Sequence, residues 1–190
     1  MAHETRRIQR VFGLEDDFET ARGVMAAVQR VGKQYISIPM TDASDPEKVA
    51  AFLQDGSHGS FTTQDLPLFD IILNGVPYDG IDVLANFGEA KELYGLPEFA
   101  DLQQVGLLSS ARNRMYGNDG ENVFVQPKIL AINGFDIFAR PKVTRGVGTT
   151  PHPDTLEMNV LGMIEGIEQG TYDLGAKVNT RVTLLKPYST

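Results

Sequence analysis

The residues that could do chemistry gather in one glycine-rich loop, Thr144–Asp154, with the sequence TRGVGTTPHPD. Arg145 precedes two glycines, and backbone N–H groups in such a stretch can form a nest that binds an anion. No lysine follows the glycines and no helical pattern begins there, so a flexible loop is the better interpretation. His152 and Asp154 flank Pro153 and could serve metal binding or acid–base chemistry. Because prolines stand on both sides of the histidine, we interpret this segment as a stiff exposed turn.

Two acidic pairs could in principle act as paired carboxylates. Asp16 and Asp17 stand at the start of an expected helix, whereas Asp119 and Glu121 flank a turn, so both are interpreted as solvated surface. The chain has no cysteine, no Walker A sequence, no dinucleotide fingerprint, no G-x-S-x-G and no H-E-x-x-H. The sequence therefore predicts no metal, no cofactor and no enzymatic activity. The alternative is an enzyme or small-ligand-binding protein that uses residues 144–154 as a lid.

Length and charge limit the remaining classes of protein. At 190 residues the chain suits one domain, and its net charge of −8 disfavours tight nucleic-acid binding. Its one cationic cluster, Arg6, Arg7 and Arg10, lies in an expected mobile arm over residues 1–12. No apolar run is long enough to suggest a membrane span.

Helices and short strands are expected in the first two thirds of the chain. A helix that ends at Gly32 is predicted, because apolar residues recur at three- and four-residue spacing. These residues are Leu14, Phe18, Ala21, Met25, Val28 and Val31. A short strand is expected at Gln34–Met40, where Pro39 allows only an edge or an end of a strand. The further expected elements are a helix from Asp45, a strand at Leu68–Leu73, and short helices at Ile81–Leu84 and within Pro97–Arg112.

The last third, residues 121–188, is expected to be a β block. Asn133-Gly134 predicts a hairpin between strands Asn122–Ile132 and Phe135–Val143, because this dipeptide favours a type I′ turn. A second strand pair is expected from Thr155–Gln169 and Val178–Lys186, the latter with alternating apolar residues. The predicted fold is therefore α+β, an antiparallel β barrel or sandwich with flanking helices.

Three segments of this block, residues 156–170, 173–176 and 178–188, resemble the closing strands of bacteriophage tail tube proteins. The resemblance implies a virion structural protein, a tail tube or tail and neck component assembled in the host cytoplasm. Its partners would be copies of itself in hexameric rings and other virion proteins. An acidic lumen would suit a conduit for DNA.

Within this hypothesis the long loop would be the subunit contact, since loops of this length are usually functional or disordered. Its contact residues would be Arg145, Val147, Thr149, Pro151, His152 and Asp154. Light scattering would separate a ring-forming protein from the enzyme alternative.

Overall fold

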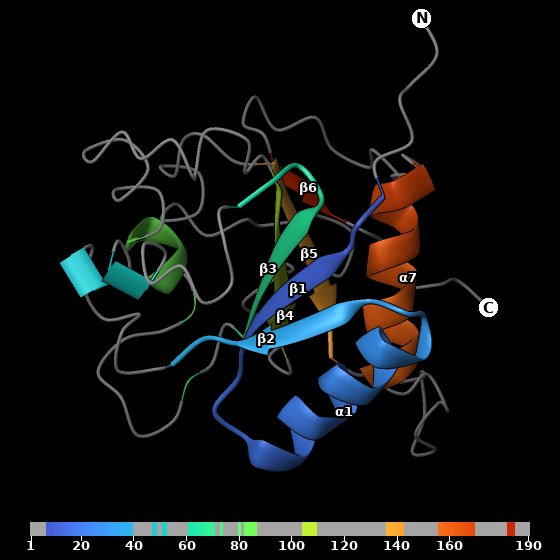
Figure 1. The fold of residues 1–190 in the computed structure, drawn as a ribbon, viewed down its shortest axis with the longest axis horizontal. Helices are drawn as coiled ribbons and strands as arrows, with labels where there is room; N and C mark the ends of the chain where they lie inside the picture. Colours follow the sequence, from blue (N-terminus) through green and yellow to red (C-terminus); the bar gives the residue numbers. More distant parts are fainter. Residues whose placement is uncertain are drawn as a thin grey trace, which may run out of the picture.

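A computed structural model gives the fold, and it describes residues 7–39, 47–48, 51–52, 61–70, 73, 80, 82–86, 104–109, 136–142, 156–169 and 182–184 (Figure 1). The elements in chain order are β1 (Arg10–Leu14), α1 (Phe18–Arg30), β2 (Gln34–Ser37), β3 (Asp65–Asp70), β4 (Gln104–Ser109), β5 (Asp136–Pro141), α7 (Leu156–Gln169) and β6 (Val182–Leu184). Residues 47–48, 51–52 and 82–86 are also helical. Among the described residues no helix is long and apolar enough to cross a membrane.

The six strands form one sheet in the order β2-β1-β3-β4-β5-β6, and every neighbouring pair is parallel. The predicted antiparallel barrel or sandwich is therefore wrong. Parallel neighbours need long crossover connections rather than tight turns, and helices in those connections cover the faces of the sheet.

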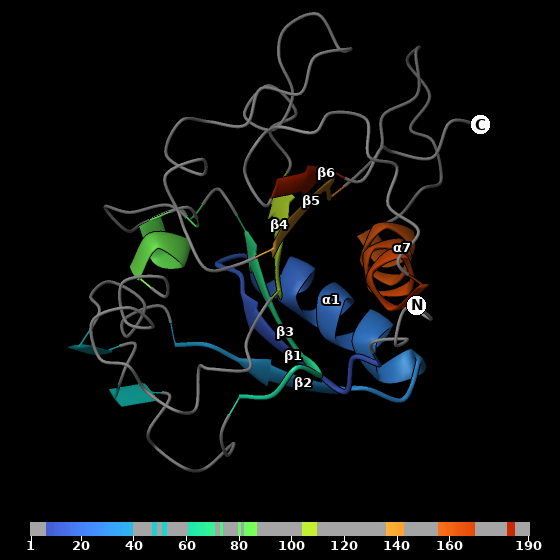
Figure 2. The same ribbon diagram turned by 90° about the horizontal axis from the view of Figure 1, so that it is seen from above.

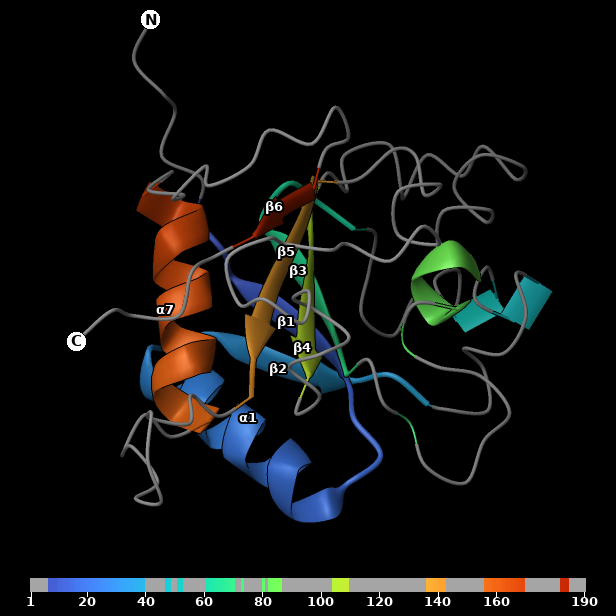
Figure 3. The ribbon, with the colours of Figure 1, turned by 180° about the vertical axis from the view of Figure 1, so that it is seen from behind.

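The predicted Asn133-Gly134 turn lies outside the described residues, but the hairpin that it implied is wrong. β5 has β4 along one edge and β6 along the other, both parallel (Figure 3). Since a strand has only two edges, no antiparallel partner can pair with Ile137–Ala139, where both edges are occupied. Within the predicted strand Val178–Lys186, the structure describes residues 182–184, and these form β6.

α7 replaces the strand predicted at Thr155–Gln169. Val160, Met163, Ile164 and Ile167 are all buried, and their spacing of three or four places them on one face of a helix. Gly162 and Gly166 interrupt the sequence, which lowers helix propensity, but packing on the sheet outweighs that cost.

β4 was also predicted wrongly, as a helix within Pro97–Arg112. Residues 104–108 are buried on both faces of the sheet. The sequence of the strand is therefore a nearly continuous apolar run, without the alternation of apolar and polar residues that marks a half-buried strand. Val105 and Leu108 are three residues apart and therefore also fitted a helical pattern. The short predicted helix at Ile81–Leu84 is confirmed for the described residues 82–84.

The first helix is confirmed, although it starts later and faces differently than expected. Asp17 caps it by accepting a hydrogen bond from the Thr20 backbone N–H at 2.7 Å, and Gly32 follows it with a positive φ of 72°. Leu14 belongs to β1, and Phe18 is 71% exposed. The buried face of α1 consists of Val24, Ala27 and Val28.

β1 lies inside the sheet, between β2 and β3, and its Val11 and Phe12 are fully buried. Residues 10–12, which the sequence assigned to an N-terminal arm, therefore belong to an inner strand of the sheet. β2 is the outermost strand next to it and ends before Pro39, in agreement with the expectation that Pro39 allows only an edge or an end of a strand.

Helices α1 and α7 pack side by side on one face of the sheet, and residues 82–86 lie on the other side (Figure 2). The core between the two helices and the sheet includes Val11, Leu66, Phe138 and Met163. Two ion pairs connect α7 to α1 and to the residues that follow α1. Arg30 pairs with Glu157, and Lys33 Nζ lies 2.5 Å from Glu168 Oε1.

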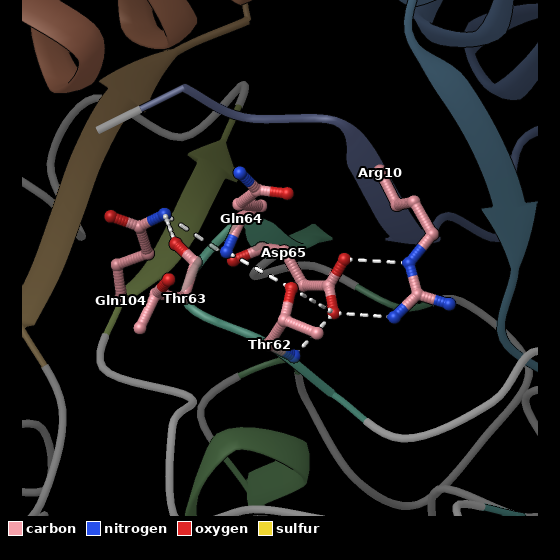
Figure 4. A network of polar contacts seen from close by, with 6 residues as sticks. All are labelled: Arg10, Thr62, Thr63, Gln64, Asp65 and Gln104. Atoms are coloured by element: carbon pink, nitrogen blue, oxygen red, sulfur yellow. Dashed lines mark hydrogen bonds and ion pairs between the residues drawn. The ribbon is translucent and has the colours of Figure 1, made fainter. Parts of the chain in front are cut away.

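A polar network fixes the amino-terminal ends of β1, β3 and β4 (Figure 4). Arg10 donates to both carboxylate oxygens of Asp65, at 2.7 and 2.6 Å, and the Thr62 backbone N–H donates to the same carboxylate at 2.7 Å. Gln104 donates from Nε2 to the carbonyl oxygens of Thr63 and Asp65. These contacts set the start of β3 against β1.

Gly13 allows Tyr35 to lie directly on β1. A Cβ at position 13 would overlap the ring of Tyr35, so only glycine leaves room for the aromatic side chain there. Tyr35 also packs against the core under α1 and α7. The close contact joins the edge strand to its neighbour on the helix-covered face.

We expect Gly13→Ala to lower the free energy of unfolding by about 1–3 kcal/mol, because the new methyl group must displace a ring. Urea denaturation of Gly13→Ala, Tyr35→Ala and the double variant forms the test. In the double variant the clash is absent, so its loss should be smaller than the sum of the single losses. Strictly additive losses would contradict this account of Gly13.

Candidate functional site

The topology predicts where a site should lie. In open sheets of parallel strands, ligands bind outside the carboxyl ends of the strands, where the strand order reverses. Here the chain passes from β1 to β2 on one side and then returns to β3 on the other. The reversal point therefore lies between β1 and β3.

Charged residues occupy this edge of the sheet. Glu15 and Asp16 directly follow β1, Asp70 ends β3, and Lys142 directly follows β5. One carboxylate oxygen from each of the three acidic residues lies within 4.8 Å of the other two. Strands distant in sequence thus bring four charges together because they are parallel and end at one level.

Lys142 lies between two of the carboxylates. Its Nζ is 2.6 Å from Asp70 Oδ2 and 2.7 Å from Glu15 Oε2. The side chains of Glu15 and Asp70 are only 4% and 2% exposed, and that of Lys142 is 11% exposed. A buried carboxylate needs a paired charge, and one ammonium group here serves two.

Burial and charge crowding shift the pKa values of this cluster. Burial, together with the negative charge of Asp70, raises the pKa of Glu15 to about 7, although the hydrogen bond and the positive charge of Lys142 oppose the increase. Burial alone would lower the pKa of Lys142, but its bonds to Asp70 and Glu15 outweigh burial and raise it. Glu15 therefore gains or loses a proton near neutral pH.

The donor atoms suit a small, hard divalent cation. Mg²⁺ binds carboxylate oxygens, usually through one or two carboxylates together with water and substrate phosphates. Glu15, Asp16 and Asp70 offer such oxygens from two adjacent strand ends. The residues present therefore fit a magnesium-type ion, which Glu15, Asp16 and Asp70 would hold.

Ser109 ends β4 at the same edge of the sheet. In the register of the strands it lies opposite Pro141, and the preceding Leu108 lies opposite Asp70. β4 lies between β3, which ends at Asp70, and β5, which precedes Lys142. A hydroxyl-bearing residue therefore stands at the end of the strand between them.

The sequence directed attention to other residues. The expected contact residues, Arg145, Val147, Thr149, Pro151, His152 and Asp154, lie outside the described residues, as do Asp119 and Glu121. Asp17 is a helix-start residue as expected, and hydrogen bonds from Thr20 lower its pKa. Asp16, also interpreted as solvated surface, instead joins the carboxylate cluster.

Glu15, Asp70 and Lys142 were not recognised from the sequence. A signal was present, because a charged residue stands at or just after the end of each of three short segments rich in apolar residues, RVFGL, DLPLF and DIFARP. That signal has meaning only if the segments are parallel strands of one sheet, and the expected antiparallel fold concealed it.

Solved structures provide the comparisons. The response regulator domain of CheB from Thermotoga maritima is 14% identical over 86% of this chain and 96% of its own, with a TM-score of 0.50. The N-terminal domain of a response regulator/sensory box/GGDEF protein from Carboxydothermus hydrogenoformans is 15% identical, covering 86% and 96% of the two chains, with a TM-score of 0.49. The Mn²⁺-bound form of response regulator Rcp1 is 20% identical over 83% and 92%, with a TM-score of 0.47. No protein-family model matches the chain, and no curated protein matches it significantly.

The likeness to the CheB domain shows that this chain has the fold of a receiver domain. It overturns the resemblance to tail tube proteins, because the residues taken as their closing strands contain α7 and one strand of a parallel sheet. The expected tail component, with its hexameric rings and virion location, is therefore wrong.

We expect the stability of the protein to fall as the pH rises from about 4.5 to about 7, because of Glu15. Its pKa is higher in the folded state than its ordinary value of 4.5, so the folded state holds more protons across this interval. Urea denaturation at several pH values measures the slope. Glu15→Gln should flatten it, whereas Glu19→Gln, at an exposed position on α1, should leave it unchanged. Equal slopes in the wild type and Glu15→Gln would contradict the assignment.

Proposed function

We propose that this chain is a phosphoryl-accepting signalling domain, with Asp70 as the acceptor. The observation that carries the proposal is the buried cluster at the β1–β3 reversal point, in which Lys142 Nζ lies 2.6 Å from the Asp70 carboxylate. Glu15 and Asp16 adjoin the same carboxylate. A nucleophilic carboxylate, a neighbouring cation and further oxygen ligands are the groups that phosphoryl transfer to an aspartate needs.

The chemical step is a displacement at phosphorus. An Asp70 carboxylate oxygen attacks the phosphorus atom of a phosphodonor, the new O–P bond forms an acyl phosphate, and the leaving group departs with its electron pair. Lys142 offsets the negative charge that the phosphoryl oxygens bring into the site. A divalent cation bound by Glu15, Asp16 and Asp70 would supply further charge neutralisation.

The burial of Asp70 favours this role. At 3% exposure the residue is shielded from bulk water, which protects an acyl phosphate from hydrolysis and strengthens the attraction of nearby positive charge. The fold shared with the CheB response regulator domain supports the same proposal, although the residues of this chain carry it.

In this proposal the domain accepts a phosphoryl group rather than turning over a substrate, in line with the expectation that it is not an enzyme. Its partners would be proteins that donate the group or respond to it. Association with copies of itself stays a prediction that light scattering can measure. The fold gives no reason to expect rings.

We expect the purified protein to gain the mass of one phosphoryl group when incubated with acetyl phosphate and Mg²⁺. Asp70→Asn should abolish the gain, because an amide is a poor nucleophile at phosphorus. Glu19→Gln removes a carboxylate from the exposed start of α1 and serves as the matched control, with an unchanged gain. Intact-protein mass spectrometry, followed by peptide mapping, makes the measurement. Labelling at another residue, or undiminished labelling of Asp70→Asn, would refute the proposal.

A further inference from the structure

We propose that Asn159 is a positioning residue, which holds the Lys142 ammonium between Glu15 and Asp70 by fixing the main chain of the lysine. Its Nδ2 donates a hydrogen bond to the Lys142 carbonyl oxygen at 3.1 Å. The chemical meaning of this arrangement rests on the proposed function, but the arrangement itself can be tested without it.

Asn159 is an unusual residue for its place. It lies in the first turns of α7, next to the buried Val160, and is only 2% exposed. Asparagine is a mediocre helix former, and buried polar side chains are found where they have hydrogen-bond partners. The bond to Lys142 therefore accounts for a polar residue on a helix face that is otherwise apolar.

The helix that carries Asn159 packs closely on two sides. Gly106 on β4 lets Met163 approach the sheet, and a Cβ at position 106 would lie 2.7 Å from the Met163 sulfur. A Cβ at Gly23 on α1 would lie 2.9 Å from Leu156 at the start of α7. Because α7 packs closely against both the sheet and α1, the packing places the Asn159 amide beside the end of β5.

A fixed main chain matters most for a lysine. Four rotatable bonds separate its Cα from the ammonium group, so the position of the ammonium depends on where the main chain starts and on what attracts the charge. Lys142 is the first residue after β5, where the strand ladder no longer holds the backbone. The hydrogen bond from Asn159 holds the Lys142 backbone in place of the strand ladder. The ammonium group of the same lysine bridges two carboxylates.

A merely structural role for Asn159, satisfying a buried carbonyl, predicts general loosening of the fold when the bond is lost. The positioning role predicts a change confined to Lys142. Lys33 offers an internal comparison, because its side chain is 9% exposed and its Nζ is held by Glu168 and by the Ile8 carbonyl oxygen. Both lysines are buried and paired, and the hydrogen bond from Asn159 is made to Lys142.

The test is the rate at which an amine-acylating reagent labels Lys142 and Lys33 in the full chain, measured by peptide mass spectrometry. In Asn159→Leu we expect labelling of Lys142 to rise at least several-fold relative to Lys33. Val160→Ala, which removes buried volume from the neighbouring position, should leave the ratio at the wild-type value. If Asn159→Leu does not fold, Asn159→Ser gives the same comparison. An unchanged ratio, or equal acceleration of both lysines, would overturn the proposal.

A second measurement uses the affinity for Mn²⁺. A displaced ammonium repels a bound cation less, so Asn159→Leu should bind Mn²⁺ several-fold more tightly, whereas general loosening would weaken binding. Lys142→Ala should tighten binding as well, and adding Asn159→Leu to it should have no further effect. If Asn159→Leu changed the Mn²⁺ affinity of Lys142→Ala by the same factor as that of the wild type, Asn159 would not act through Lys142. If the wild type binds no Mn²⁺ and accepts no phosphoryl group, the proposed function fails, while the labelling ratio still decides the role of Asn159.

Discussion

The ion pairing of Lys142 with Glu15 and Asp70 is the interaction on which this edge of the molecule depends. Two carboxylates that are almost fully buried repel each other and lose hydration, and a single ammonium group offsets both effects. Removing one partner from a buried pair commonly costs about 3–5 kcal/mol, because the other charge is left uncompensated. The pairing also imposes geometry, since it requires β1, β3 and β5 to end at the same level.

That geometry is available only in a parallel sheet. In an antiparallel sheet with this strand order, the carboxyl ends of adjacent strands alternate between the two edges, so the residues that follow β1 would not share an edge with Asp70 and Lys142. The opposite edge shows a different use of charge. There Arg10 and Asp65 form a bidentate pair at the start of two strands, and the backbone N–H of Thr62 completes it. One edge of the sheet thus carries a closed structural pair, and the other carries an excess of acidic groups.

Much of the local structure could be predicted from the sequence, but the topology could not. The helix ended by Gly32 and the edge strand near Pro39 follow from local signals that tertiary packing does not alter. β4 was predicted as a helix and α7 as a strand, for different reasons. β4 is buried on both faces of the sheet and therefore shows no decisive periodicity. In α7 the two glycines, Gly162 and Gly166, lower helix propensity, and packing on the sheet outweighs that cost. The site was missed because the topology was not predicted. Asp70 and Lys142 are 72 positions apart, and only the parallel register brings them together. The glycines and the one histidine at 144–154 belong to familiar local motifs, whereas the site consists of common charged residues at strand ends.

The position of β1 has a consequence for how the chain folds during synthesis. The Ile8 backbone N–H donates to Glu168 Oε1 at 2.8 Å, a contact between residues separated by 160 positions. Val11 on the inner strand β1 belongs to the same core as Val160 and Met163 of α7. During synthesis β1 therefore leaves the ribosome about 150 residues before the helix that covers it, at the usual rate of about 5–20 residues per second. For several seconds the apolar face of the sheet is therefore not covered by α7. The core can be completed only after residue 169 has been translated. A chain whose synthesis stops before that point would be a substrate for chaperones and proteases.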